Sequence, residues 1–200
     1  MRRPRRKAEE TRQDILGAAE ALFRAKGIAN CSMADIAQEL RMSPANVFKH
    51  FHSKLALVDT ICERHISLMV DRLASLDEKA PAPLRLARVV RNIMEAHQRD
   101  ITDNPHLFEM ILMVSEAGLP SALVYRQKIE DLFADLIDQG KQAGIYHCED
   151  PRETSRCVGA AFASVLHPVL LAAAEPGELA DRCNGLVELV NAALQNKFAK

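Results

Sequence analysis

Residues 32–54 constrain the fold more than any other stretch, because they predict two short helices joined by a tight turn. Ser32 fits the N-cap of the first helix, and Asp35 three residues later supplies the acidic partner of a near-capping box. Ser43 and Pro44 restart a helix, since serine caps a helix N-terminus and proline is tolerated at the first helical position. The spacing therefore predicts a helix-turn-helix.

The second of these helices has an inner and an outer face. Val47 and Phe51 are expected to point inward, because they share one face at helical spacing. The outer faces carry small, amide, cationic and imidazole side chains, contributed by Ala45, Asn46, Lys49 and His50. Side chains of these kinds suit the major groove of DNA, so this helix is expected to contact DNA bases.

The same stretch, with the residues before it, resembles the TetR family of bacterial transcriptional regulators. The resemblance covers about the first third of the chain and consists of a series of motifs in fixed order. These motifs are Thr11-Arg12-Gln13-Asp14-Ile15-Leu16, Ala18-Ala19, Leu22-Phe23, Lys26-Gly27, Ser32-Met33-Ala34-Asp35-Ile36-Ala37, Ser43-Pro44, Phe48-Lys49-His50-Phe51, Ser53-Lys54 and Leu57.

The chain departs from the family pattern at two positions. Arg41 stands where the family usually has a turn glycine. Either this arginine adopts a left-handed conformation at a cost of about 1 kcal/mol, or the turn differs slightly. Phe48 stands where the family usually has a tyrosine whose hydroxyl touches a phosphate, which removes the basis for that one contact.

Two sets of residues are expected to bind DNA. Lys49 and Lys54 are expected to supply chiefly affinity, while Asn46 and His50 contribute to sequence choice. The first set lies in and around the helix-turn-helix and comprises Ser32, Met33, Ser43, Pro44, Ala45, Asn46, Phe48, Lys49, His50 and Lys54. The second set lies near the N-terminus and comprises Arg3, Arg5, Arg6 and Lys7.

Charge is unevenly distributed, although the formal net charge is only −1. Residues 1–55 hold 11 Lys and Arg against 6 Asp and Glu, whereas residues 56–200 hold 15 against 21. Five cations occur in the six residues from Arg2 to Lys7, within a basic N-terminal arm that we take as residues 1–8. The arm is either a solubilising tail or a segment that enters the minor groove, and the adjacent helix-turn-helix favours the second interpretation.

Helical periodicity runs through nearly the whole chain and predicts an all-α protein of about nine helices. After the arm, residues 9–55 are expected to form a three-helix DNA-binding domain with the helix-turn-helix. Residues 56–200 are expected to form a helical domain for ligand binding and dimerisation. Outside the helix-turn-helix, the expected helices are 10–26, 53–76, 84–102, 105–117, 121–143, 151–174 and 178–197.

The last two expected helices are unusually apolar. Residues 157–174 are hydrophobic nearly all round, which is typical of a helix buried on several sides. Pro168 should kink this helix and so shape either a ligand cavity or a dimer seam. The pair predicts a twofold four-helix interface, and therefore a homodimer through residues 151–197. The resemblance implies the same arrangement, since family members are homodimers joined through their last two long helices.

Residues 84–144 combine methionine and aromatic side chains with a few polar tips. This composition suits a hydrophobic ligand cavity, although core packing explains most of the residues taken singly. By resemblance, family members bind a small molecule within helices four to eight. The expected ligand-binding residues are Met94, His97, Phe108, Met110, Met113, Tyr125, Phe133 and His167.

Several other classes of protein have little support in the sequence. The histidines lack metal-ligand spacing and the five cysteines contain no C-x-x-C pair, so no metal site and reduced thiols are expected. Nucleophile elbows, phosphate loops and dinucleotide fingerprints are missing, so neither enzymatic activity nor a cofactor is expected. No apolar run approaches about 20 residues and no secretory apolar segment follows the N-terminus, so we expect a cytoplasmic protein without a membrane partner.

These observations predict a homodimeric transcriptional regulator, expected to be a repressor, that binds a pseudo-palindromic operator in double-stranded DNA. Its affinity for DNA should fall when a small hydrophobic ligand occupies the C-terminal domain. The first alternative is the same fold acting as a regulator or chromosome-organising DNA binder without a small-molecule ligand. A second alternative, an enzyme or carrier built on an all-α bundle, is disfavoured by the basic N-terminal region.

Overall fold

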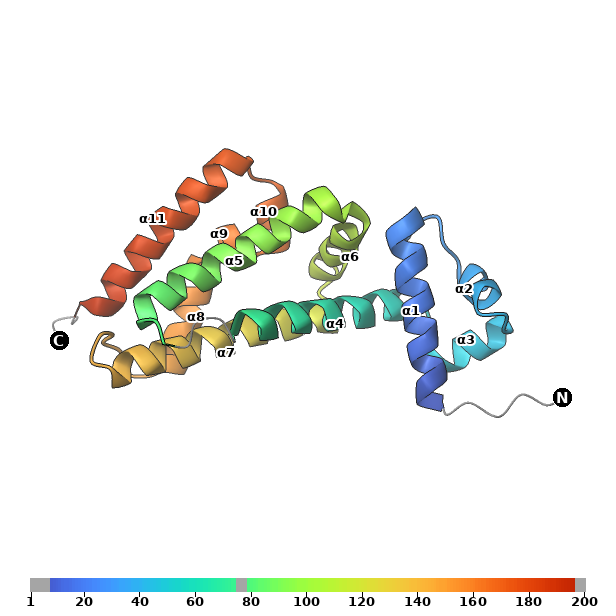
Figure 1. The fold of residues 1–200 in the computed structure, drawn as a ribbon, viewed down its shortest axis with the longest axis horizontal. Helices are drawn as coiled ribbons and strands as arrows, with labels where there is room; N and C mark the ends of the chain where they lie inside the picture. The colour runs from blue at the N-terminus through green and yellow to red at the C-terminus, as the bar shows by residue number, and fades with distance from the viewer. Residues whose placement is uncertain (1–7, 75–78, 197–200) are drawn as a thin grey trace.

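The computed structural model describes residues 8–74 and 79–196. In this part of the chain the protein folds into eleven α-helices and contains no strand. Three N-terminal helices form one end of an elongated molecule, and the remaining helices form a larger body (Figure 1). The all-α fold and the N-terminal helix-turn-helix predicted from the sequence are both confirmed.

The N-terminal end consists of α1 (Ala8–Lys26), α2 (Met33–Glu39) and α3 (Pro44–His50). The three helices enclose a small core in which Ile15, Phe23, Ile36 and Val47 are fully buried. The guanidinium carbon of Arg12 on α1 lies 4.5 Å from the centre of the Phe51 ring, directly after α3. This cation–π contact adds to the apolar packing that holds α3 in a fixed orientation against α1.

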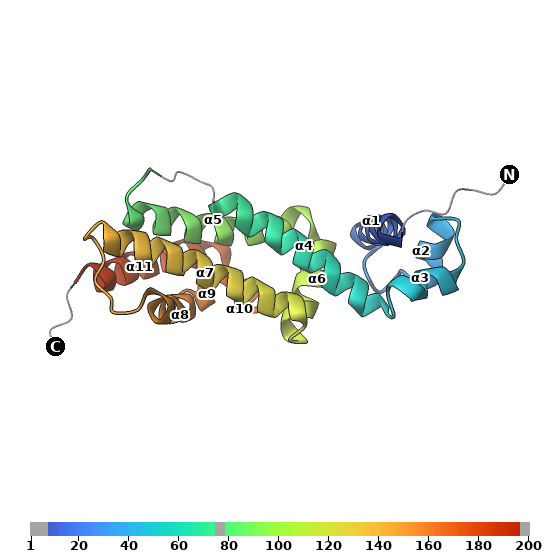
Figure 2. The same cartoon turned by 90° about the horizontal axis from the view of Figure 1, so that it is seen from below.

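The long helix α4 (Lys54–Ala74) connects the two ends of the molecule. It starts directly beyond α3 and continues into the body, where it runs alongside α7 (Figure 2). Its first turns bury Leu57, Val58 and Ile61. A displacement of this helix in the body would therefore move the N-terminal helices, because a helix transmits motion along its axis.

The body is a bundle whose helices mostly begin at a proline. Seven helices in the described residues carry proline in their first turn, where the missing N–H costs no hydrogen bond. Among these residues, no single helix has the length and apolar composition needed to cross a bilayer; α6 and α7 meet that test only as a pair bent by 91°. The body helices are α5 (Ala82–Asp103), α6 (Pro105–Glu116), α7 (Pro120–Gln142), α8 (Pro151–Ala161), α9 (Ala163–Leu166), α10 (Pro168–Ala172) and α11 (Pro176–Gln195).

The helix expected over residues 151–174 is divided into three. It is interrupted first at Phe162, and again at His167, whose backbone is extended (φ −77°, ψ 122°). A residue before proline is pushed out of the helical region, so Pro168 breaks this segment where only a kink was expected. The division into α8, α9 and α10 explains why the described residues contain eleven helices, where about nine were predicted.

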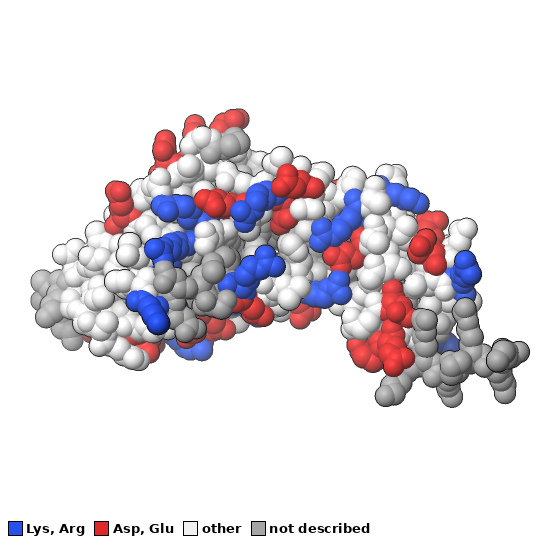
Figure 3. Space-filling model, in the orientation of Figure 1, with Lys and Arg blue, Asp and Glu red and all other residues white. Residues whose placement is uncertain are grey.

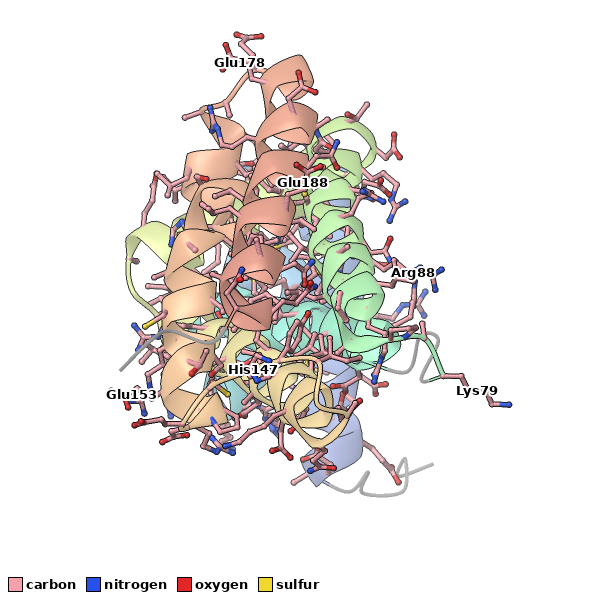
Figure 4. All side chains as sticks on the ribbon, turned by 90° about the vertical axis from the view of Figure 1, so that its left-hand side faces the viewer. Lys79, Arg88, His147, Glu153, Glu178 and Glu188 are labelled. Atoms are coloured by element: carbon pink, nitrogen blue, oxygen red, sulfur yellow. The ribbon has the colours of Figure 1, made fainter. Side chains whose placement is uncertain are left out.

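Tyr146 packs at the end of the body that lies farthest from the N-terminal helices, and it links several segments there. Its ring is fully buried and occupies the space where a Cβ atom on Gly140 would lie, 2.2 Å from a ring carbon. The Tyr146 hydroxyl donates to Asn191 Oδ1 on α11, and the Asn191 amide donates in turn to the carbonyl of Pro83. This chain of contacts holds α11 between α8 and α5, as Figure 4 shows.

Candidate nucleic-acid interface and ligand groove

Both helix caps predicted for the helix-turn-helix are present. The Ser32 hydroxyl accepts from the Asp35 N–H at 3.1 Å, while the Asp35 carboxylate accepts from the Ser32 N–H at 2.7 Å, which completes a capping box. The Ser32 hydroxyl also donates to the Asp35 carboxylate at 2.7 Å, and this bond, with the one from the Ser32 N–H, lowers the pKa of Asp35. At the next helix, the Ser43 hydroxyl accepts from the Asn46 N–H at 3.3 Å.

The turn between the helices is made by Arg41. Its φ of +53° lies in the left-handed region, so the arginine adopts the conformation for which glycine is the usual residue. The Arg41 N–H donates to the carbonyl of Gln38 at 3.0 Å, and the Met42 N–H donates to that of Ala37 at 2.9 Å. Of the two alternatives left open by the sequence, the left-handed arginine is the one present, and the backbone turns tightly despite the missing glycine.

The face of α3 that points away from the core carries most of the expected base-reading residues. Val47 and Phe51 are buried, as predicted. Phe48 is 45% exposed although it is aromatic. Asn46 and His50 are half-buried. The exposed residues are Ser43, Pro44, Ala45, Phe48 and Lys49.

Two expected DNA-binding side chains are used inside the protein. Met33 is buried, because it shares a face with Ile36 and so points toward the core. The Lys54 ammonium donates to the carbonyl oxygens of Ile28 at 2.7 Å and Cys31 at 2.9 Å, which ties the loop after α1 to the start of α4. These bonds could not be predicted from the sequence, since Ile28 and Cys31 lie more than twenty residues before Lys54.

The expected N-terminal contacts of Arg3, Arg5, Arg6 and Lys7 lie outside the described residues. Residues 8–55 hold six Lys and Arg and six Asp and Glu, so the cationic excess of the N-terminal region belongs to residues 2–7. On the face shown in Figure 3, acidic and basic side chains are likewise interspersed over the described helices. The net positive charge of residues 1–55 is therefore contributed by the arm.

Most of the expected ligand-binding side chains lie in the interior of the body. Met94, His97, Phe108, Met110, Tyr125 and Phe133 are buried, Met113 is half-buried and His167 is exposed. The His97 ring meets those of Phe108 and Tyr125 edge to face, with centroids 6.3 Å and 5.7 Å apart. Its Nε2 atom lies 3.1 Å from the Tyr125 hydroxyl. Within this core of aromatic and methionine side chains, His97 and Tyr125 thus form a hydrogen-bonded polar pair.

A groove of about 370 Å³ runs between α7 and the α8–α10 segment. Of the eight expected ligand-binding residues, Tyr125 and His167 line it. Its walls also include the small residues Gly159, Ala160 and Ala163. Met113 lines a different groove, of about 240 Å³, next to Val58 of α4.

The outer face of α8 and α11 is apolar and uncovered in the single chain. Leu189 is 65% exposed, and Ala161 and Ala193, which line a groove with it, are exposed as well. A groove of about 450 Å³ lies between the two helices, and Leu189 and Cys157 are among the residues that line it. Figure 4 views the body from this end, with the two helices side by side. Helix α8 is thus buried only on its inner side in one copy of the chain.

A polar network connects the body to α1 and α4. The Asp100 carboxylate of α5 lies 3.1 Å from His65 Nε2 of α4 and accepts from the Asn104 amide at 3.3 Å. The side-chain oxygen Oδ1 of Asn104 accepts from the Arg24 guanidinium of α1 at 3.3 Å. Sequence reasoning missed these residues, because the partners are up to 80 positions apart.

The described residues contain no group of three or more His, Cys, Asp or Glu suited to a metal ion.

Comparison with known families matches both parts of the molecule. The family model of the C-terminal domain of tetracyclin repressor-like proteins matches residues 82–187, more than half of the chain. The model of bacterial regulatory proteins of the tetR family matches residues 15–61, which contain the helix-turn-helix. The HTH-type transcriptional regulator TtgR of Pseudomonas putida is 35% identical over 82 residues, or 39% of this chain and 37% of that protein. The chain thus matches little more than a third of the length of this curated relative.

Solved structures share the whole fold at low sequence identity. A TetR-family transcriptional regulator from Pectobacterium atrosepticum superimposes with a TM-score of 0.74 at 21% identity, covering 98% of this chain and all of that one. The TetR-family repressor FadR of Thermus thermophilus, solved in complex with lauroyl-CoA, gives 0.67 at 20% identity and covers 94% of this chain and 97% of that one. At these identities the likeness concerns the fold.

Proposed function

Because this chain belongs to the TetR family of bacterial transcriptional regulators, we propose that it is a repressor that binds operator DNA as a homodimer and leaves it when a small hydrophobic molecule binds. The observation that carries the DNA-binding part is the orientation of α3. Val47 and Phe51 fasten one face of this helix to the core, while Phe48 and Lys49 are exposed on the other. A helix presented in this way can enter a major groove.

The proposed DNA contacts divide into base reading and phosphate binding. Asn46 and His50 are half-buried at the edge of the exposed face, where their polar ends can contact base edges. Lys49 and the N-terminal arm supply the cations for phosphate. The arm follows the duplex beside α1 and inserts its arginines into the minor groove, which is supported by the concentration of positive charge in residues 2–7. Lys54 has a smaller share, because its ammonium is held by two backbone carbonyls.

The proposed dimer forms through α8 and α11, within residues 151–197. Support comes from the uncovered apolar face around Leu189, since an exposed patch of this kind marks an interface in many proteins. Two copies related by a twofold axis would place their α3 helices on one side of the duplex. Because the two copies are related by a twofold axis, the operator is pseudo-palindromic. Its half-sites fall in successive major grooves, which lie about 34 Å apart.

The proposed effector site lies in the body, in the groove beside Tyr125 and the core around His97. The complex of Thermus thermophilus FadR with lauroyl-CoA supports a ligand site in this fold. Occupation of the site lowers DNA affinity by shifting α5 and α4. The end of α5 contacts α1 through the bond between Asn104 and Arg24, and α4 contacts α1 through the ion pair of Arg64 and Glu20. The domain boundary proposed near residue 55 falls at the start of α4, so this helix serves both domains.

Selection of bound DNA from a random pool tests this function directly. We expect enrichment of a sequence with two inverted half-sites about one helical turn apart. The selected duplex should bind Lys49→Ala more weakly than wild type, whereas Lys141→Ala, at the far end of α7, should bind normally. A pool that enriches no sequence, or equal binding of both variants, would contradict the proposed role of α3.

A further inference from the structure

A hydrogen-bonding atom without a partner is buried in the body. The imidazole Nδ1 of His97 makes no hydrogen bond among the described residues, although the side chain is only 1% exposed. A polar atom buried without a partner destabilises the fold, because it has lost its hydrogen bond to water. Native proteins rarely retain such an atom without a reason, which can be a bound molecule.

The hydrogen bonds around His97 determine which of its nitrogens carries the proton. The Tyr125 hydroxyl has a single hydrogen and donates it to the carbonyl oxygen of Leu166 at 2.9 Å. Toward His97 Nε2, at 3.1 Å, the same hydroxyl can therefore only accept. It follows that Nε2 is protonated and donates to Tyr125.

The second ring nitrogen must then be a bare acceptor. Burial lowers the pKa of His97 to about 4, so the ring is neutral near pH 7 and carries one proton only. Since that proton is on Nε2, Nδ1 presents a lone pair. The group that complements it has to be a hydrogen-bond donor.

His97 does not itself line the groove, but its Nε2 is hydrogen-bonded to Tyr125, which does. Tyr125 and Leu166, which are hydrogen-bonded to each other beside His97, both line the groove between α7 and the α8–α10 segment. The break at His167 and Pro168 lines the same end. With a volume of about 370 Å³, the groove falls within the range of about 300–1,000 Å³ typical of small-molecule sites.

We propose that His97 Nδ1 is the polar anchor of the effector, and that the effector is a neutral, largely apolar molecule with a hydroxyl or N–H donor. This inference rests on the proposed function, because it assumes that the body holds the effector. A carboxylate is the wrong group, since its charge would face a lone pair close to the Asp100 carboxylate on the next turn of α5. A cation is disfavoured, because it would lose its hydration among the aromatic side chains of Phe108 and Tyr125.

Matched probes that differ in one group test the proposal. 2-Naphthol carries the donor, 2-methoxynaphthalene retains the oxygen without it, and 2-naphthoate carries the negative charge. Calorimetry on the full chain without DNA should show 2-naphthol binding about tenfold more tightly than the ether, with the naphthoate weakest. Equal binding of naphthol and ether, or no binding of any probe, would overturn the proposal. Equal binding would indicate that a water molecule satisfies Nδ1.

Two variants separate the hydrogen bond from the shape of the site. His97→Phe preserves a ring of similar size but removes the lone pair, so the preference for naphthol over the ether should disappear. His97→Gln can donate to Tyr125 through its amide and accept through its carbonyl, so part of the preference should return. Circular dichroism melts establish that each variant is folded. A preference that survives in His97→Phe would overturn the proposed anchor.

The proton position has an independent readout in ¹⁵N NMR of imidazole-labelled protein, which checks the anchor even in a variant that binds probes poorly. The resonance of Nδ1 should report an unprotonated nitrogen and should shift when 2-naphthol is added. A protonated Nδ1 would overturn the proposal.

Release of the selected operator is measured separately. Release by naphthol from both wild type and His97→Phe would support the proposed function while removing His97 from it, whereas failure to bind any operator would remove the function and leave the probe result unaffected.

Discussion

The carboxylate of Asp100 on α5 lies 3.1 Å from Nε2 of His65 on α4, and the same carboxylate accepts a hydrogen bond from Asn104. Through Asn104 this pair reaches Arg24 on α1. Burial raises the pKa of Asp100, but the hydrogen bond and charge of His65 outweigh that effect, and the pKa is lowered overall. The contacts that join α5 to α4 and α1 therefore favour the ionised form of the Asp100 carboxyl group.

Replacing Asp100 with asparagine should change how stability depends on acid. A carboxyl whose pKa is lower in the folded state stabilises the fold above its unfolded pKa of about 3.9, and this contribution is lost as the pH falls through the folded value. Asp100→Asn should therefore lose about 1 kcal/mol at pH 7 and show a flatter decline below pH 4. Urea unfolding from pH 2.5 to 7 measures both effects. The exposed neighbour Asp103 provides the control, and an equal change in Asp103→Asn would contradict the role given to Asp100.

His97 should control stability in a higher range of pH. Burial lowers its pKa to about 4; Asp100 opposes that shift, while His65 and His167 add to it. The unfolded chain takes up a proton near pH 6.5 and the folded chain does not, so stability should fall as the pH drops from about 6.5 to 4, by at most about 1.4 kcal/mol per unit. In His97→Phe the slope in this range should be smaller. Urea unfolding at half-unit intervals measures the slope, and an unchanged slope would show that His97 is protonated in the folded state.

Gly140→Ala should be the most destabilising glycine substitution in the body. The added Cβ would lie 2.2 Å from the Tyr146 ring, which is fixed by burial and by its bond to Asn191. We expect a loss of about 1–3 kcal/mol from overpacking. Gly17→Ala on α1 is the matched helical control, because nothing lies within 4 Å of its Cβ and helix propensity favours alanine by about 1 kcal/mol. Thermal unfolding compares the two. A Gly140→Ala protein as stable as wild type would mean that Tyr146 can move aside.

Lys49 and Lys54 should separate DNA affinity from stability. Lys54→Met removes the donor from the carbonyls of Ile28 and Cys31 while retaining the apolar stem, so the protein should lose about 1–3 kcal/mol of stability. Lys49→Ala should leave stability unchanged and reduce the salt dependence of operator binding by up to about one charge. Urea unfolding and binding at several salt concentrations measure these quantities. If Lys54→Met changed only DNA binding, its ammonium would be a phosphate ligand, as the sequence alone suggested.

The features predictable from the sequence were local. Capping by Ser32 and Ser43 depends on neighbours within three residues, and the buried face of α3 follows from helical spacing. The bond between His65 and Asp100 could not be predicted, because its partners are 35 residues apart and only tertiary packing brings them together. Apolar composition marked the core around His97, but whether such residues line a space or fill one depends on packing that a periodic pattern does not encode.

Leu189→Glu should separate the dimer without unfolding the chain. Leu189 is 65% exposed in one copy, so a charge there costs little in a monomer, whereas at the proposed interface it would be buried without a partner. Sedimentation should give twice 22.2 kDa for wild type and 22.2 kDa for the variant. Leu68→Glu on α4 is the control, because that leucine is 61% exposed and lies outside the proposed interface. Cys157, exposed on the α8 side, should react with a thiol reagent faster in Leu189→Glu than in wild type. A wild-type protein that sediments as a monomer at micromolar concentration, or a Leu189→Glu protein that remains dimeric, would show that this apolar face is not the contact between copies.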